Sequence, residues 1–250
     1  MKKDNLINFL QVKNQTETSV DLYFYGDIVS SWYGAWDDAD QYPERVRDFL
    51  KDYENKDLNI YINSGGGSVF AGMAIYNMLK RHKGTKTVYV DGLAGSIASV
   101  IAMAGDRIVV PKNSFLMIHK PLVGVSGNAN ELRETADLLD NIEQAIINVY
   151  QDNIVEGVDI ETIKEMVNDE TWLNGEEASQ YFNIELAEEN KAVAKVESEY
   201  LNKICKNIPE NLNNQVEENK EIENNTKDEP IILTNYNVDY YKAKIKTYEL

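Results

Sequence analysis

The sequence is poor in the residue types on which most metal and redox sites depend. Cys205 is the only cysteine among 250 residues, so no disulfide can form within the chain and a CxxC site is excluded. There are two histidines, His82 and His119, whereas catalytic zinc usually takes two or three histidine ligands. We therefore expect neither a metal site nor a cofactor.

Basic residues are also scarce. The chain has 25 Lys and Arg against 42 Asp and Glu, a formal net charge of -17, and so lacks the positive surface that nucleic acid or an anionic membrane attracts. Asp4 and Asn5 stand where the apolar part of a secretory signal should begin, and the apolar run Gly92–Gly105 is too short to span a bilayer. These features predict a soluble cytoplasmic protein that binds neither nucleic acid nor membranes.

Composition divides the chain into four segments. After an N-terminal segment, residues 1–18, residues 19–189 alternate short apolar runs with helical patterns, which predicts an α/β domain. Residues 190–230 are acidic and rich in Asn and Glu, and we expect a disordered linker because they cannot bury enough apolar surface to offset their chain entropy. Residues 231–250 regain β-branched residues and tyrosines and form a separate tail.

Strands and helices are expected to alternate within the α/β domain. The strands are residues 20–26, 58–63, 86–91, 107–111 and 114–119, and the helices are residues 44–53, 68–81, 96–104, 129–155 and 160–167. The longest helix has apolar positions that mostly fall three or four residues apart, as the buried stripe of a helix does. These positions are Leu132, Leu139, Ile142, Ile146 and Val149.

Three consecutive glycines, Gly65–Gly67, follow an expected strand and precede an expected helix. Glycines admit positive φ and leave their N–H groups unshielded, and amides in front of a helix attract negative charge. The run lacks the GK[ST] of a P-loop and the spacing of a dinucleotide fingerprint. It is therefore either an anion-binding loop or a flexible turn.

Ser96 lies on a second strand-to-helix turn, in the segment GLAGSIAS. This is the position of a nucleophile elbow, although the G-x-S-x-G spacing of the hydrolases is absent. The small residues Gly92, Ala94 and Gly95 would allow backbone and substrate to approach closely, and a helix N-terminus favours negative charge nearby. The alternative is an ordinary serine that caps the helix.

His119 ends a strongly apolar expected strand, and Lys120–Pro121 then turns the chain out of the sheet. A histidine in this position can be partly desolvated and oriented, as a general base must be, although a structural histidine at the edge of the core is the more usual case. His82 lies at a helix end, where we expect it to cap the last carbonyls and meet solvent. The glycine loop, Ser96 and His119 would converge at one end of the domain.

The order and spacing of these segments resemble the Clp protease proteolytic subunit and its relatives. The matching blocks lie between Leu22 and Ile184: YINSGGGSVFAGMAIYNML, GLAGSIASVIAMAG, FLMIHKPL and WLNGEEASQYFNI. The resemblance implies an α/β fold of the Clp protease and crotonase type, built from repeated β-β-α units with a protruding handle helix at residues 129–155. It also implies a serine-type endopeptidase that acts on proteins or peptides and forms a ring-shaped homo-oligomer, either a heptamer or stacked rings.

The family's catalytic residues carry over to named positions of this sequence. By resemblance Ser96 is the nucleophile and His119 is the base that takes its proton. Gly66 or Gly67, together with the amide of Ile97, would hold the oxyanion. Water would then hydrolyse the acyl-enzyme.

The third member of the triad departs from the family pattern. The family's aspartate lies two residues before an aromatic residue that aligns with Trp172, so its position is taken by Glu170, with Asp169 as the alternative. Thr171 replaces the arginine that helps couple stacked rings in housekeeping members, and Gly65 replaces the usual proline.

These departures resemble the Clp-type proteases that phages and prophages encode, which are similar to head maturation proteases. Such enzymes trim capsid and scaffold proteins during virion assembly, so the partners would be capsid or scaffold proteins in the host cytoplasm. The alternative is a degradative peptidase partnered by a Clp ATPase. A crotonase-type acyl-CoA enzyme, which shares the fold and oxyanion hole, and a non-catalytic assembly scaffold also remain open.

Overall fold

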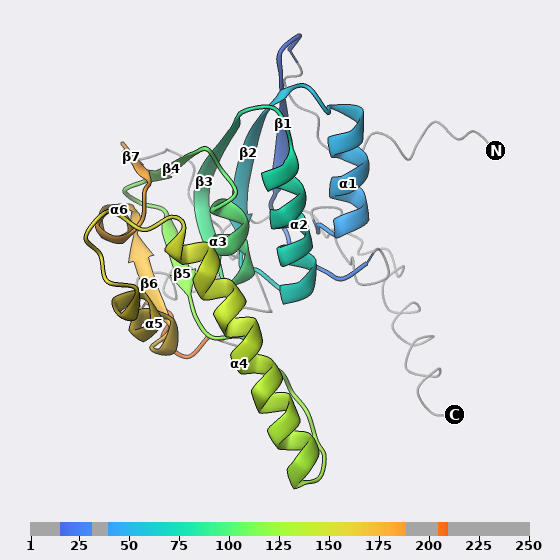
Figure 1. Cartoon of the computed structure of the whole chain (residues 1–250). Coiled ribbons are helices and arrows are strands. Elements are labelled where there is room, and N and C mark those ends of the chain that lie inside the picture. The colour runs from blue at the N-terminus through green and yellow to red at the C-terminus, as the bar shows by residue number, and fades with distance from the viewer. Residues whose placement is uncertain (1–15, 32–39, 189–204, 210–250) are drawn as a thin grey trace, which may run out of the picture. The chain divides into compact units, whose positions relative to one another are not determined.

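Parallel strand pairing forms the centre of the computed structural model, which describes residues 16–31, 40–188 and 205–209 (Figure 1). The strands that follow one another across the sheet, all parallel, are β1 (Ser19–Phe24), β2 (Asp57–Ser64), β3 (Lys86–Gly95), β4 (Arg107–Pro111) and β7 (Glu185–Ala187). The segments predicted at residues 1–18, 190–230 and 231–250 lie almost wholly outside the described residues.

Strand β3 pairs with two different strands on the same side. Its first half, at Thr87–Tyr89, pairs with β4, and its last three residues, Leu93–Gly95, pair in parallel with β5 (Phe115–Ile118). Strand β6 (Thr171–Asn174) then runs antiparallel to β5. This fork in the sheet sets the end of β5 beside the end of β3.

The strands form where apolar residues alternate. Every second residue of β2 is buried, and the fully buried positions include Ile60 and Ile62. Helix α1 (Pro43–Asp52) buries Val46, Phe49 and Leu50, as the spacing of an amphipathic helix requires. The remaining helices are α2 (Val69–Arg81), α3 (Ile97–Ala102), α4 (Ala129–Gln151), α5 (Ile160–Asn168) and α6 (Gly175–Tyr181).

Helix α4 projects from the sheet by its N-terminal half (Figure 1). The predicted buried stripe is correct for its C-terminal half, where Ile146 and Val149 are buried, but wrong for Leu132, which is 44% exposed. The physical reason is length, because the helix has 23 residues and its first turns extend beyond the core. Apolar periodicity shows which face of a helix is apolar, but it does not show how much of that face is covered.

The expected α/β class is confirmed, with a mostly parallel sheet. All ten expected elements are present, and their ends differ by up to four residues from the prediction. The short elements β6, α6 and β7 were not expected, because each is too short to show a clear period. No helix in the described ranges is both long enough and apolar enough to cross a membrane.

Candidate active site

Three segments that follow strands converge at the carboxyl ends of those strands. Gly65–Gly67 joins β2 to α2, Ser96 joins β3 to α3, and His119 follows β5. Because β3 pairs with β2 on one side and with β5 on the other, the three segments are neighbours. The carboxyl edge of parallel strands is also where open α/β sheets usually bind their ligands.

Ser96 and His119 are directly hydrogen-bonded. The distance between Ser96 Oγ and His119 Nε2 is 2.7 Å. Ser96 has φ 52° and ψ -127°, a backbone conformation rare outside glycine, and its side chain makes no capping hydrogen bond to α3. The alternative of an ordinary capping serine is therefore wrong, since the hydroxyl points to the imidazole and not to the helix amides.

His119 has the protonation behaviour that a base requires. It is 9% exposed, and burial lowers the pKa of its imidazole, while the carboxylate of Glu170 acts in the opposite direction. A neutral imidazole at pH 7 can accept the Ser96 proton through Nε2. The pair can therefore act as a nucleophile and its general base.

The glycine loop packs closely against the turn at Ser96 and is hydrogen-bonded to its surroundings. Gly66 has φ 101°, and a Cβ there would lie 2.7 Å from both the Gly95 carbonyl oxygen and Ser96 Cβ. The Gly66 N–H donates to Ser64 Oγ at 3.1 Å, and that hydroxyl donates to the Gly26 carbonyl at 2.6 Å. The backbone of the loop thus approaches the serine as closely as glycine alone permits.

The three predicted oxyanion donors lie close to Ser96. The Gly66 amide donates to Ser64 Oγ, Gly67 lines the same cavity as Ser96 and His119, and a Cβ on Gly66 would lie 3.1 Å from the Ile97 nitrogen. The choice between Gly66 and Gly67 stays a prediction. Ile97 is the first residue of α3, and an N–H in the first turn has no carbonyl of its own helix to bond.

Glu170 lies near His119 but bonds elsewhere. Its backbone also has a positive φ of 52°, and its Oε1 accepts the N–H groups of Lys206 at 2.7 Å and Asn207 at 2.9 Å. Among the described residues, the one hydrogen bond of His119's side chain is to Ser96. The imidazole Nδ1 therefore has no carboxylate partner in this conformation.

Asp169, the alternative third member, ends α5 and accepts a hydrogen bond from Asn168 Nδ2 at 3.0 Å. The structure thus brings Ser96 and His119 together and sets Glu170 and Asp169 beside them without a hydrogen bond. The assignment of the third member stays a prediction.

His82 lies outside this site and, as expected, is the C-cap of α2, where its backbone N–H donates to the Leu79 carbonyl at 3.0 Å. Its ring Nε2 is 2.7 Å from the Lys56 carbonyl, in the turn before β2, and does not bond the last carbonyls of α2. Among the described residues, no three His, Cys, Asp or Glu side chains gather where a metal ion could bind.

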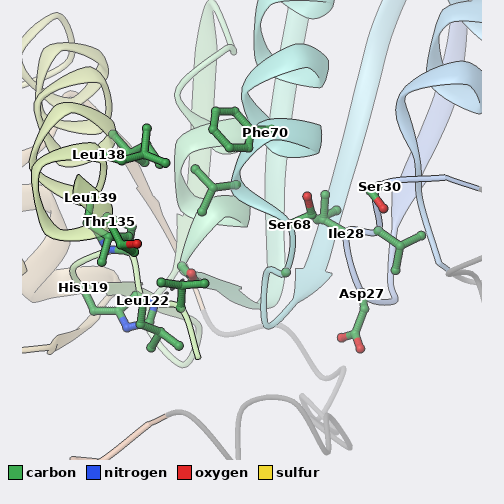
Figure 2. Close-up of a pocket in the computed structure, with 17 residues that line it drawn as sticks. Asp27, Ile28, Ser30, Ser68, Phe70, His119, Leu122, Thr135, Leu138 and Leu139 are labelled. Atoms are coloured by element: carbon green, nitrogen blue, oxygen red, sulfur yellow. Dashed lines mark hydrogen bonds between the residues drawn. The ribbon is translucent and has the colours of Figure 1, made fainter. Parts of the chain in front are cut away.

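A mostly apolar cavity of about 540 Å³ opens beside Ser96 and His119. Figure 2 shows Ile28 on one side, His119 and Leu122 on the other, and Phe70 and Leu138 from α2 and α4 above them. The sequence analysis did not identify Ile28, Phe70, Leu122 and Leu138 as cavity residues, because they come from four separate segments. The sequence offered one signal for them, the apolar residues Leu122, Val123 and Val125, which follow shortly after His119.

The comparison with known families agrees with this geometry. The family model for Clp protease matches residues 48–185, more than half of the chain. The chain belongs to the Clp protease family. Family membership makes it a serine-type peptidase, and the matched range contains Ser96, His119 and Glu170.

Similar curated proteins carry the name ATP-dependent Clp protease proteolytic subunit. The chain is 37% identical over 139 residues to the one from Ligilactobacillus salivarius, covering 54% of this chain and 69% of that protein. It is 32% identical to one from Bacteroides fragilis and 31% identical to one from Bacteroides thetaiotaomicron, each over 129 residues and 50% of this chain. These two matches span 61% and 57% of the relatives' own lengths.

Proposed function

We propose that this Clp protease family member is an endopeptidase with Ser96 as nucleophile and His119 as general base. The observation that carries the proposal is the 2.7 Å hydrogen bond between Ser96 Oγ and His119 Nε2 at the mouth of the cavity. Ser96 Oγ bonds to the scissile carbonyl carbon while its proton moves to Nε2. The imidazolium then returns that proton to the leaving amine, and water attacks the acyl-enzyme by the same route.

The oxyanion of each tetrahedral intermediate is held by the backbone amide of Ile97 together with that of Gly66 or Gly67. Loss of one such donor raises the barrier by about 3–4 kcal/mol in serine proteases. Glu170 is the proposed third member, which orients the imidazole through Nδ1. Its position near His119 supports this role, since the carboxylate already favours the charged imidazole.

The cavity indicates the type of peptide that binds. Its walls include Ile28, Phe70, Leu122 and Leu138, so it would bury an apolar side chain next to the scissile bond. The proposed substrate is an extended protein segment with an apolar residue at that point, cleaved in the cytoplasm by a ring of identical subunits.

The finer proposal is a head maturation protease of a phage or prophage, which cleaves capsid or scaffold proteins. Three sequence features support it, each a departure from housekeeping members: Gly65 in the glycine loop, Glu170 as the acid, and Thr171 beside it. The name that the relatives share, ATP-dependent Clp protease proteolytic subunit, favours instead a degradative subunit that acts with an ATPase. Cleavage of a co-expressed capsid or scaffold protein by wild type but not by Ser96→Ala would support head maturation. Dependence of protein degradation on an added Clp ATPase would support the alternative.

The activity itself is tested with Ser96→Ala in the full chain. We expect hydrolysis of an unstructured protein substrate to fall by at least a thousandfold, because the remaining groups cannot form an acyl-enzyme. Ser126→Ala is the matched control, since Ser126 is exposed and is not one of the residues that line the cavity. Hydrolysis that persists in Ser96→Ala would refute the proposal, and acyl-CoA turnover in that variant would point to crotonase-type chemistry.

A further inference from the structure

Two buried hydroxyl groups lie directly behind the nucleophile. Ser99 Oγ is 2.6 Å from the Ser96 carbonyl oxygen and 2.8 Å from the hydroxyl oxygen of Tyr150, on α4. The Ser99 hydrogen is donated to the carbonyl, so the Tyr150 hydroxyl donates to Ser99 Oγ. Ser99 is 0% exposed and Tyr150 1%, so water does not compete for these bonds.

This arrangement fixes the peptide unit that joins Ser96 to Ile97. The Ser99 N–H also donates to the Ser96 carbonyl, at 3.0 Å, so that oxygen is held twice. In a planar trans peptide the carbonyl and the following N–H point in opposite directions. Holding the Ser96 carbonyl toward α3 therefore aims the Ile97 N–H away from it.

The turn needs such support. Ser96 has a positive φ, which is unfavourable for a non-glycine residue and persists only where surrounding bonds enforce it. An unsupported peptide could rotate and turn the Ile97 N–H away from the scissile carbonyl.

We propose that Tyr150 and Ser99 form a positioning relay that holds the Ile97 amide in the oxyanion hole. The proposal rests on the proposed function, because it concerns the same site. Neither residue touches the substrate. Burial raises the pKa of the Tyr150 hydroxyl, so it keeps the proton that it donates.

The test measures kcat and KM for a peptide substrate in Tyr150→Phe and Ser99→Ala. We expect each to lower kcat by about 5- to 50-fold and to leave KM within about twofold, because the oxyanion donor acts mainly in the transition state. The double variant should lose little more than Tyr150→Phe, since both substitutions break one relay. Tyr76→Phe is the control for loss of a buried tyrosine hydroxyl outside the site.

An unchanged kcat in Tyr150→Phe and Ser99→Ala would overturn the relay. The relay would also be overturned if Tyr76→Phe lowered kcat equally, because loss of any buried tyrosine hydroxyl would then have the same effect. Ser96→Ala separates the two possible failures. Hydrolysis that survives Ser96→Ala would refute the proposed function and the relay together, whereas loss of hydrolysis in Ser96→Ala with an unchanged kcat in the other two variants would refute the relay alone.

A second, independent observation concerns the segment Cys205–Asn207, which lies against the site. Cys205 packs on the buried pair Leu93 and Met117, together with Phe115 and Trp172. The next two residues, Lys206 and Asn207, give their N–H groups to Glu170 Oε1. Two amide donors on one carboxylate oxygen make a charge-assisted interaction that competes with any other partner of that oxygen.

Glu170 is also the carboxylate that is proposed to orient His119 but makes no hydrogen bond to its imidazole in this structure. His119, Glu170, Lys206 and Asn207 border a common cavity of about 260 Å³. The other charged groups around the imidazole are Lys120, Asp169 and Asp27. Lys120 is paired with Glu143 on α4 at 3.4 Å, and an ammonium group cannot accept a hydrogen bond from the imidazole in place of Glu170.

We propose that Cys205–Asn207 is an autoinhibitory latch that occupies Glu170 and leaves His119 without its orienting carboxylate. Release of the latch frees Glu170 to accept a hydrogen bond from the Nδ1–H of His119. This proposal also rests on the proposed function, and it predicts that the intact chain works below its full rate.

The test uses proline in the full chain, because proline has no N–H to donate. We expect Lys206→Pro/Asn207→Pro to raise the rate at which a fluorophosphonate labels Ser96 by about 3- to 30-fold. The control is Lys206→Ala/Asn207→Ala, which keeps both N–H groups but, like the proline pair, loses the 3.1 Å contact of Asn207 Nδ2 with the Asp169 carbonyl.

The second readout is the titration of His119 by NMR, which does not depend on turnover. The proline pair should raise the pKa of His119 relative to the alanine pair, because a carboxylate that bonds Nδ1 stabilises the imidazolium. Slower labelling in the proline pair would show instead that the two amides position Glu170 for catalysis. Equal labelling and equal pKa in the two pairs would also overturn the latch.

Discussion

At the scale of single residues, the site depends on backbone positions as much as on side chains. Ser96 has a strained backbone that points its hydroxyl to His119, and Gly66 lies where any side chain would meet Ser96 Cβ. His119 is removed from water, which keeps its imidazole neutral. Each of these features makes its own prediction.

The pH dependence follows from burial of His119. Burial lowers its pKa in the folded protein, so the imidazole stays neutral to a lower pH than an exposed histidine would. The acid limb of kcat/KM should therefore have its midpoint below about 6.5, the ordinary value for histidine. His82→Gln, which changes the other histidine, should leave that midpoint in place. A midpoint above about 6.5 would contradict the assignment of His119 as a buried base.

Gly66→Ala should abolish most of the activity. The added Cβ would lie 2.7 Å from the Gly95 carbonyl and from Ser96 Cβ, and alanine strongly disfavours a φ of 101°. We expect kcat/KM to fall at least a hundredfold, with a loss of stability on the order of 1–3 kcal/mol. Gly124→Ala is the control, because nothing lies within 4 Å of its added Cβ. An active Gly66→Ala variant would contradict the close packing of Gly66 against Gly95 and Ser96.

The sequence was most informative about residues whose chemistry is local. The turn before Ser96, the glycine run and the strand end at His119 could each be located from residue type and spacing. The partners of Glu170 could not, because the amides of Lys206 and Asn207 lie more than thirty residues away in the chain. Neither could the bond between Ser99 and Tyr150, which joins α3 to α4.

At the scale of elements, the N-terminal end of helix α4 is stabilised by a capping box. Asn128 accepts the N–H groups of Asn130 and Glu131, and Glu131 Oε2 accepts the N–H of Asn128 at 2.7 Å, which completes a capping box. The helix then contributes Thr135, Leu138 and Ile142 to the cavity. Its first turns project beyond the core, so the cap is their main support.

Asn128→Ala should loosen the start of α4. Loss of a side-chain cap costs about 1 kcal/mol, and the projecting turns have few packing contacts to compensate. We expect faster amide exchange over the first two turns, with little change in Ile146–Tyr150, and a raised KM because the cavity wall moves. Asn128→Asp keeps a capping oxygen and should exchange like wild type. Equal protection in the alanine variant would mean that other contacts hold this end.

The positions of helices and strands could be predicted wherever the apolar pattern extended over enough residues to show its period. The alternation in β2 and the spacing in α1 located both elements to within one residue. β7 has only three residues and pairs with β4 far from it in sequence, so its pairing depends on tertiary structure. Exposure along α4 likewise depends on what surrounds the helix and not on its own pattern.

At the scale of the whole molecule, the projecting part of α4 supports the proposed assembly into a ring. Large apolar side chains are exposed on this helix and on the segment that leads to it. They are Leu122, Val123, Val125, Leu132 and Leu138, of which each is at least 44% exposed. Large apolar side chains that are exposed together on one part of a molecule are typical of protein interfaces.

Light scattering on the purified chain should therefore give a mass several times the 28.5 kDa of one subunit, with seven subunits as the expected ring. Leu132→Glu should shift the distribution toward smaller species, because it places a charge in the apolar face without touching the residues that line the cavity. A monomer at micromolar concentration in the wild type would contradict the assembly proposal.

The central claim is that Ser96 is a nucleophile activated by His119, and peptide mapping after fluorophosphonate labelling tests it most directly. The account predicts one phosphonate adduct, on the peptide that contains Ser96, with labelling slowed by at least a hundredfold in His119→Ala and unaffected in His82→Gln. An adduct on another residue, no adduct, or labelling that is independent of His119 would contradict it.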